Sequence, residues 1–304
     1  MKTTVVGSYP VVKKEREELI DKIKKIFGLY DEFEYSIEIA VRDQVTAGVE
    51  IISDGQVRGD MIEIFTKNLY GFEDKRVINR VEFIKPITLK DLIFAKRVAK
   101  KIDSKVEVKG IITGPCTIAY SVRDEFYSNK EELILDLARA LRKEVEHLVR
   151  ETNYIQIDEP ILSTGIVDFD IAKRAIDIIT KDLNVFFAMH VCGSIYNIID
   201  ELNEFNVSLL DHEFASNKKN LEVLDRIKKK VGFGCVNTKS KKVESVEEIK
   251  EIIKEGLEIL KNNEFLSNNL HENVYIDPDC GMRLLSRDVA FKKLKNMVLA
   301  AKSI

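Results

Sequence analysis

Several features that mark common protein classes are missing from this sequence of 304 residues. No apolar run approaches the ~20 residues of a membrane-spanning helix, and the N-terminal stretch has no apolar signal-peptide core. We therefore expect a cytoplasmic protein without a membrane partner. The net charge is -3, so basic residues do not outnumber acidic ones, which argues against a nucleic-acid partner.

Cysteine is scarce, and its positions are scattered. The four cysteines at 116, 192, 235 and 280 form no CxxC pair, and their wide spacing does not suggest a disulfide framework. In a cytoplasmic chain such thiols favour metal binding or catalysis. No glycine-rich dinucleotide fingerprint follows the first expected strand, which argues against an open nucleotide-binding sheet.

Short apolar runs alternate with helical patterns along the whole chain. The expected strands cover residues 3–6, 49–53, 106–112, 154–157, 184–189, 207–212, 231–236 and 274–277. Helical patterns cover residues 13 to about 28, 36–47, 88–102, 130–151, 170–181, 195–203, 217–230, 245–262 and 286–302. Eight strands separated mostly by helices predict an α/β fold, a (β/α)8 TIM barrel. We expect residues 1–304 to form one domain, with a hairpin-like excursion at about 60–87.

Residues able to bind a soft metal stand at the ends of consecutive expected strands. His190 and Cys192 are two residues apart, so in a strand their side chains point the same way. Glu213 and Cys280 end two further strands. One imidazole, two thiolates and a carboxylate suit tetrahedral zinc. Any one of them alone is better explained as a core histidine or a buried thiol, but together they predict a metal site.

The charge of this ligand set indicates which chemistry it suits. About three negative charges around a divalent zinc make a poor generator of hydroxide. Such a metal is better suited to holding a substrate thiol as a nucleophilic thiolate. The ligands therefore favour thiol alkylation over hydrolysis. A closed structural zinc site remains the alternative.

Other strand ends carry candidate substrate contacts. Asp158 and Glu159 end the fourth strand, where a carboxylate can receive a substrate ammonium group; for Glu159, helix capping or a loop ion pair is an equally good interpretation. Gly7 and Ser8 follow the first strand and offer backbone and hydroxyl groups to a carboxylate, although small residues there also serve as turns.

These motifs together resemble the catalytic barrel of cobalamin-independent methionine synthase, and most of all its short archaeal relatives. The matching stretches lie in family order over nearly the whole chain: TTVVGSYP at 3–10, DMIEIF at 60–65, KGIITGP at 109–115, IQIDEP at 155–160, HVC at 190–192 and PDCG at 278–281. The resemblance implies a methyltransferase that forms methionine from homocysteine on one zinc per chain. It implies His190, Cys192, Glu213 and Cys280 as zinc ligands.

The resemblance also implies a substrate site. Ser8 and Asp158, with Gly7, would hold the amino-acid part of homocysteine. Gln56 stands where the plant and bacterial enzymes carry a glutamate for the ammonium group.

Departures from the family pattern concern the methyl donor. Tyr120 aligns with a tryptophan that serves as a pterin platform, and Lys239 or a neighbour aligns with a histidine thought to protonate the folate leaving group. We also expect no counterpart of the N-terminal barrel that helps to hold folate. These differences favour methylcobalamin or a methyl-corrinoid protein as donor, because cobalt(I) leaves without a proton.

Two alternatives remain. One is a related barrel methyltransferase that acts on another thiol, such as coenzyme M. The other is a metal-storing or corrinoid-binding protein without turnover.

Overall fold

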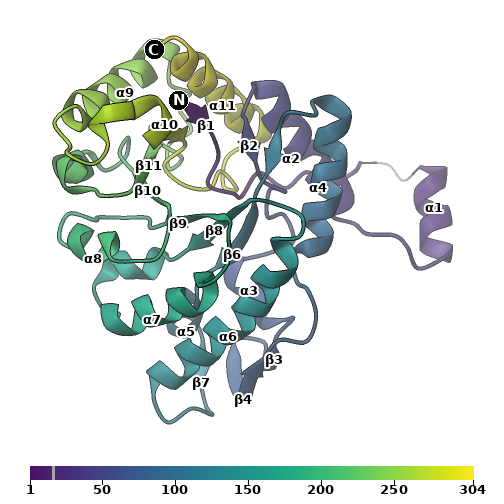
Figure 1. Cartoon of the computed structure of the whole chain (residues 1–304). Helices are drawn as coiled ribbons and strands as arrows, with labels where there is room; N and C mark the ends of the chain where they lie inside the picture. The colour runs from purple at the N-terminus through teal and green to yellow at the C-terminus, as the bar shows by residue number, and fades with distance from the viewer. Residues whose placement is uncertain (16–17) are drawn as a thin grey trace.

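Parallel strands form a closed ring in the computed structural model, which describes residues 1–15 and 18–304 (Figure 1). Seven of them pair in the order β1 (Lys2–Thr3), β12 (Val274–Asp277), β11 (Lys230–Gly234), β10 (Leu209–Glu213), β9 (Phe186–His190), β8 (Tyr154–Asp158) and β6 (Gly110–Thr113). β2 (Ile51–Ile52) pairs with β5 (Glu107–Val108), which only Lys109 separates from β6. A parallel bridge between Thr4 and Ile51 completes the ring. The predicted (β/α)8 barrel is confirmed.

Helices surround this ring (Figure 1). The longer ones are α2 (Glu34–Ala47), α4 (Leu89–Ile102), α6 (Lys130–Leu148), α7 (Phe169–Thr180), α9 (Val246–Leu260) and α11 (Arg287–Lys302). Shorter ones are α1 (Leu19–Ile26), α3 (Met61–Thr66), α5 (Pro115–Ser121), η1 (Pro160–Thr164), α8 (Ile199–Asn203), η2 (Lys218–Arg226), η3 (Ser267–Asn269) and α10 (Leu270–Asn273). Local signals explain several boundaries: Gly48, with φ of 91°, ends α2, and Ser245 and Glu248 form a capping box at the start of α9.

Three predicted helices differ from the structure. The pattern at 217–230 forms the 3-10 helix η2, because the Asn220 side chain bonds to the carbonyls of Gly193 and Glu213 and holds this segment against the barrel. The pattern at 195–203 is helical only over α8. The helix expected from 13 to about 28 is observed as α1, and residues 16–17 of that prediction lie outside the described part of the chain.

Within the segment 60–87, β3 (Tyr70–Glu73) and β4 (Arg76–Glu82) pair as an antiparallel hairpin. The short strand β7 (Arg123–Asp124) joins its edge in parallel. α3 precedes the hairpin and brings Met61 and Ile64 to the mouth of the barrel.

The side chains inside the barrel change from apolar to polar along its axis. A small apolar cluster of Ile51, Leu209 and Tyr275 packs with Tyr154 and Phe186. Two residues further along the strands, the interior becomes polar: Lys109, Gln156, Asp211 and Asp277 are each at most 6% exposed. Burying polar groups lowers the stability of the fold unless these groups form hydrogen bonds. The partners of this layer therefore matter for the site that lies directly above it.

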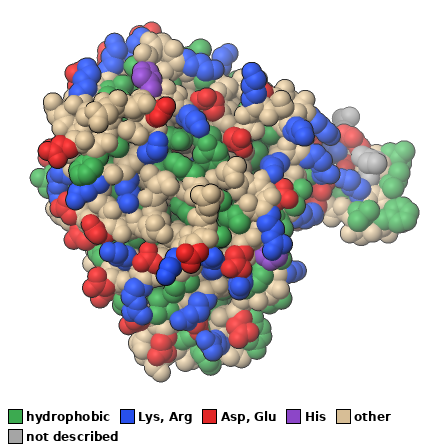
Figure 2. Space-filling view, viewed as in Figure 1, with side chains coloured by type: hydrophobic (Ala, Val, Ile, Leu, Met, Phe, Trp, Pro, Cys, Tyr) green, Lys and Arg blue, Asp and Glu red, His purple; other side chains and the backbone are tan. Residues whose placement is uncertain are grey.

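α1 stands apart from the barrel (Figure 1), and Figure 2 shows apolar side chains on this projecting segment. Leu19 and Ile26 are 75% and 79% exposed. Among the helices that the structure describes, none combines the length and the apolar character needed to cross a membrane.

Candidate metal centre and substrate pocket

Three of the four predicted metal ligands meet at the mouth of the barrel. His190 is the last residue of β9, and its Nε2 lies 2.8 Å from Cys192 Sγ. Cys280, three residues beyond β12, brings its Sγ to 3.1 Å from that of Cys192. The three ligand atoms lie within 4.8 Å of one another. An imidazole nitrogen and two sulfurs at this spacing fit the donor preferences of zinc.

Electrostatics favour a thiolate at this cluster. A hydrogen bond from Cys192 lowers the pKa of the Cys280 thiol to about 4; burial opposes this shift, and His190 adds to it. The same hydrogen bond, together with burial, raises the pKa of the Cys192 thiol. A thiolate is the form of cysteine that binds metals, so the free protein already holds one ligand in the required state.

Glu213 lies nearby but outside this cluster. It ends β10, and its Oε2 pairs with Lys239 Nζ at 2.8 Å and accepts a hydrogen bond from Ser216 Oγ at 3.2 Å. Its Oε1 accepts from the Gly193 amide at 3.1 Å. Both carboxylate oxygens therefore have protein partners, and the fourth predicted ligand faces a lysine.

Two aspartates that we did not predict support the site. Asp211, on β10, places Oδ2 3.1 Å from His190 Nδ1, off the line of an ideal hydrogen bond. Asp279 accepts hydrogen bonds from the amides of residues 214–216, which fixes the loop that follows Glu213. The signal for Asp279 was present in the PDCG motif. Asp211 had none, because its partner lies on another strand.

A pocket of about 270 Å³ opens above the cluster and is lined by His190, Cys192 and Cys280. Ser8, Gln56 and Asp158 also line it, as predicted for substrate contacts. Gly7 lies just behind, where a Cβ would come within 2.6 Å of Gln56 Oε1.

Asp158 is the buried carboxylate of this pocket. It is 5% exposed, and burial raises its pKa to about 6, against the opposing influence of His190 and Gln156. Its Oδ1 accepts a hydrogen bond of 2.6 Å from Gln156 Nε2. A buried carboxylate next to the cluster suits a cationic group of a small substrate.

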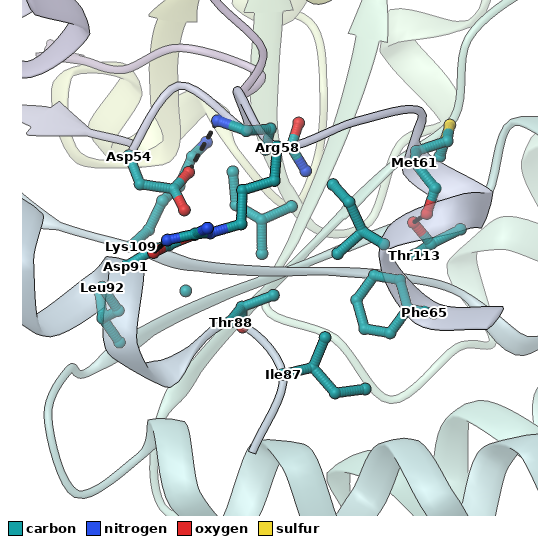
Figure 3. A pocket seen from close by; sticks show the side chains of 14 residues that line it. Asp54, Arg58, Met61, Phe65, Ile87, Thr88, Asp91, Leu92, Lys109 and Thr113 are labelled. Atoms are coloured by element: carbon teal, nitrogen blue, oxygen red, sulfur yellow. Dashed lines mark hydrogen bonds and ion pairs between the residues drawn. The ribbon is translucent and has the colours of Figure 1, made fainter. Parts of the chain in front are cut away.

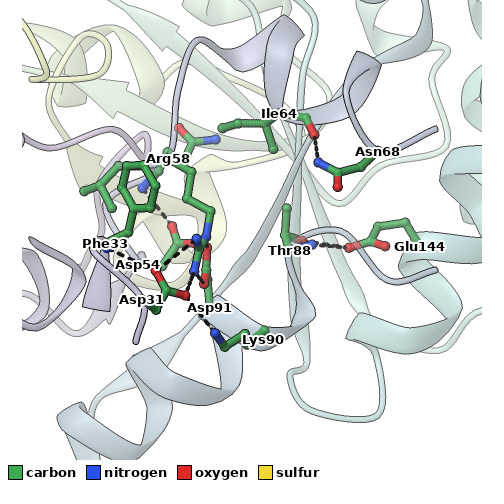
Figure 4. Close-up of polar contacts among 12 residues, drawn as sticks. Asp31, Phe33, Asp54, Arg58, Ile64, Asn68, Thr88, Lys90, Asp91 and Glu144 are labelled. Carbon is green, nitrogen blue, oxygen red and sulfur yellow. Dashed lines mark hydrogen bonds and ion pairs between the residues drawn. The ribbon is translucent and has the colours of Figure 1, made fainter. Parts of the chain in front are cut away.

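The loop that carries Gln56 is held from two sides. Arg283 donates to the carbonyls of residues 56, 57 and 59. Arg58 bridges Asp31 and Asp91, with Nη2 2.6 Å from Asp31 Oδ2 (Figure 4). Arg58 and Asp91 also border a small cavity of about 30 Å³ behind the pocket (Figure 3), with room for about one water molecule. Together, the contacts of Arg283 and Arg58 hold the backbone around Gln56 at the wall of the pocket.

The two predicted donor-side residues lie in different places. Tyr120, on α5, is not among the described residues that line the pocket, and its hydroxyl bonds to the Ile166 carbonyl at 3.2 Å. The Lys239 side chain is 64% exposed, and its hydrogen bond with Glu213 raises its pKa. The structure therefore places Lys239 beside Glu213, whereas Tyr120 bonds to the backbone of residue 166.

Glu159 caps a helix in this structure. It is fully buried and accepts hydrogen bonds from the Cys116 amide at 2.9 Å, the Thr117 amide at 2.7 Å and Thr117 Oγ1 at 2.6 Å. These groups open α5, and Gly114 leaves room for the carboxylate. Glu159 makes no side-chain cap for the helix η1 that directly follows it, so its capping role is toward α5, a helix that begins more than 40 residues earlier in the chain.

Replacing Glu159 with Ala should lower the free energy of unfolding by about 3 kcal/mol, because it leaves buried amides without an acceptor. Urea denaturation measures this loss, and Glu251→Ala, at an exposed position of α9, serves as control, with an expected change within about 0.5 kcal/mol. An unchanged stability together with a raised KM for substrate would instead place Glu159 in substrate binding.

Comparisons with known proteins agree with this geometry. The family described as "Cobalamin-independent synthase, Catalytic domain" matches residues 1–303. The methionine synthase of Methanocaldococcus jannaschii is 71% identical over 307 residues, covering 100% of this chain and 99% of that protein. That of Methanothermobacter marburgensis is 48% identical over 315 residues, covering 99% of each.

A solved structure has the same fold. The B12-independent methionine synthase from a Shewanella species superposes with a TM-score of 0.82 at 22% identity, covering 99% of this chain and 96% of that one. The fold and the full-length family match agree: the chain belongs to the family of the cobalamin-independent methionine synthase catalytic domain and is a methyltransferase enzyme.

Proposed function

We propose that this chain transfers a methyl group to the thiol of homocysteine and so forms methionine, as a single catalytic barrel over residues 1–304. The observation that carries the proposal is the group of one imidazole and two thiols at the floor of a pocket with a buried carboxylate. Relatives named methionine synthase that match over their full length support the same reaction.

His190, Cys192 and Cys280 would hold one zinc ion, and Glu213 would complete the set. Zinc in such a site supplies a Lewis acid that keeps a bound thiol in the thiolate form at neutral pH. The thiol proton passes to solvent. The thiolate sulfur then attacks the methyl carbon, and the bond from that carbon to the donor breaks, with its electron pair remaining on the donor.

The pocket residues would orient the amino-acid part of homocysteine. Asp158 would receive the ammonium group, because it is an almost fully buried carboxylate within the same pocket as the thiols. Gln56 would add an amide oxygen, and Ser8, with the backbone at Gly7, would face the carboxylate. This arrangement directs the substrate sulfur toward His190, Cys192 and Cys280.

We favour a methylated corrinoid, either methylcobalamin or a corrinoid protein, as donor. Lys239, which stands at or near the position of the family's proton-donating histidine, has a raised pKa and is therefore a weak acid for a folate nitrogen. Tyr120 is not among the described residues that line the pocket, and its hydroxyl bonds to the Ile166 carbonyl, so no observed contact favours it as a pterin platform.

Purified zinc-loaded protein supplied with methylcobalamin should convert homocysteine to methionine. Coenzyme M serves as the competing thiol, and chromatography of both products measures the preference. A preference for coenzyme M would identify the second thiol as the substrate. Stoichiometric uptake of zinc or corrinoid without product would identify a binding protein.

The Asp158→Asn variant separates amino-acid recognition from thiol activation. It should raise KM for homocysteine about tenfold or more, because a charge-assisted hydrogen bond to the ammonium group is lost. It should change turnover of a simple alkyl thiol, which has no ammonium group, much less. Equal losses for both thiols would show that Asp158 acts elsewhere.

A further inference from the structure

Two carboxylates beneath the cluster, Asp211 and Asp277, have no role in the chemistry of the proposed function. Asp211 is 1% exposed and Asp277 is 0% exposed, both in the polar layer of the barrel interior. Asp211 Oδ1 and both oxygens of Asp277 lack a hydrogen bond from any conventional donor among the described residues. Such orphaned acceptors are rare in native proteins and call for a physical explanation.

The lysine of this polar layer does not supply the missing hydrogen bonds. Lys109 Nζ has three protons, and its contacts are Thr4 Oγ1, the Val5 carbonyl and Gln156 Oε1. The Gln156 amide in turn donates to the Val6 carbonyl and to Asp158. Both potential donors of the layer are therefore engaged elsewhere. The two aspartates can satisfy each other only if one of them carries a proton.

The contacts assign this proton to Asp277. Asp211 faces His190 Nδ1 through Oδ2 at 3.1 Å, so it serves there as an acceptor, whereas neither oxygen of Asp277 has another partner among the described residues. Burial, and secondarily the negative charge of Asp211, raise the pKa of Asp277 well above its usual value, in keeping with this assignment. A protonated Asp277 would thus donate to Asp211.

The strand register places Asp211 next to His190 and opposite a glycine that leaves room for its side chain. Asp211 pairs with His190 across β9 and β10 and with Gly232 across β10 and β11. A Cβ at position 232 would lie 2.7 Å from Asp211 Cβ, so this glycine provides the room that the carboxylate occupies. Oδ2 stands 3.1 Å from His190 Nδ1, while Nε2 faces Cys192 at 2.8 Å.

We propose that Asp211 is a positioning residue that keeps the proton of His190 on Nδ1 and turns Nε2 toward the metal, and that Asp277 holds Asp211 in place through a hydrogen bond from its carboxyl proton. This inference rests on the proposed zinc site. Carboxylate partners of metal-bound histidines fix the tautomer and ring orientation and increase ligand basicity. Here the support extends to a second carboxyl group deeper in the barrel.

Zinc affinity of the substrate-free protein, measured by competition with a chromophoric chelator, tests the proposal. The Asp211→Ala variant should bind zinc about 10- to 100-fold more weakly than wild type, and Asp211→Asn should recover part of this loss because its amide oxygen can still accept from Nδ1. Asp136→Asn, a matched change at a buried aspartate on α6, should stay within about twofold of wild type. The visible spectrum of cobalt-substituted protein should change for Asp211→Ala only.

Asp277 provides the sharper test, because Asn can also donate a hydrogen bond. Asp277→Asn should keep zinc affinity within about threefold of wild type, whereas Asp277→Ala should weaken it about tenfold. A loss in Asp277→Asn as large as in Asp211→Ala would overturn the role of a neutral donor. An unchanged affinity in Asp211→Ala, or an equal loss in Asp136→Asn, would overturn the positioning role.

The result for wild-type protein separates this inference from the function on which it rests. A wild-type protein that binds no zinc would refute the proposed function. A wild-type protein that binds zinc and makes methionine, together with an Asp211→Ala variant of unchanged affinity, would refute only the positioning role.

Discussion

Replacing Cys192 or Cys280 with serine should reduce the zinc content from about one ion per chain to none and abolish methyl transfer. Each variant removes one of the two sulfurs of the three-atom cluster, and a serine hydroxyl is a poor ligand for zinc at neutral pH. The barrel should remain folded, because both residues lie beyond the ends of their strands. Metal analysis, a methionine assay and circular dichroism measure the three outcomes.

Cys235→Ser is the matched control, since this thiol is fully buried but belongs to no ligand group that the structure describes. It should retain zinc, whatever its effect on stability. Full metal retention in both ligand variants would refute the site. Collapse of the fold in those variants would instead identify a structural zinc.

Methionine should form from methylcobalamin or a methyl-corrinoid protein, and little or none from methyltetrahydrofolate. A folate nitrogen is a basic leaving group that needs an acid with a pKa near the working pH. Lys239 lies beside Glu213, and its hydrogen bond with Glu213 moves its pKa upward, away from that range. Cobalt(I) leaves without a proton. Parallel assays with the two donors measure the ratio directly.

The Lys239→Ala variant refines this prediction. It should keep most of the corrinoid activity, because no step with that donor requires a proton from Lys239. Lys242→Ala serves as control for loss of a nearby exposed lysine, since Lys242 pairs with Glu248 rather than with Glu213. Efficient turnover with folate that disappears only in Lys239→Ala would show that Lys239 replaces the family's histidine and that the donor assignment is wrong.

The lysine partner of Glu213 also affects how the metal site is assembled. Glu213 Oε2 already contacts both Lys239 Nζ and Ser216 Oγ, whereas Oε1 accepts one hydrogen bond, from the Gly193 amide, and keeps a second acceptor site. The three-membered cluster is therefore the part of the site whose ligand atoms are already gathered, and Glu213 would join it either through Oε1 or by releasing Lys239.

Local patterns determined the fold and most of the site. Strand ends are visible in a sequence because apolar runs stop where the barrel meets solvent, and a parallel barrel gathers those ends at one mouth. This reasoning located His190, Cys192 and Cys280, as well as Ser8 and Asp158, and the family resemblance added Gln56; the structure brings all six to one pocket. Capping signals likewise predicted the start of α9.

Only the tertiary structure decided the partners of the charged groups. Glu213 pairs with Lys239 from the loop after β11, Asp211 stands behind His190, and Glu159 caps α5. Each contact joins segments far apart in the chain. The sequence around a carboxylate has no pattern that indicates which residue will be its partner. Strand register and loop path set these distances to within an ångström, and the energy of a buried charge depends on them. The sequence by itself determined which residues reach the mouth, and the folded chain decided which of them bind one another.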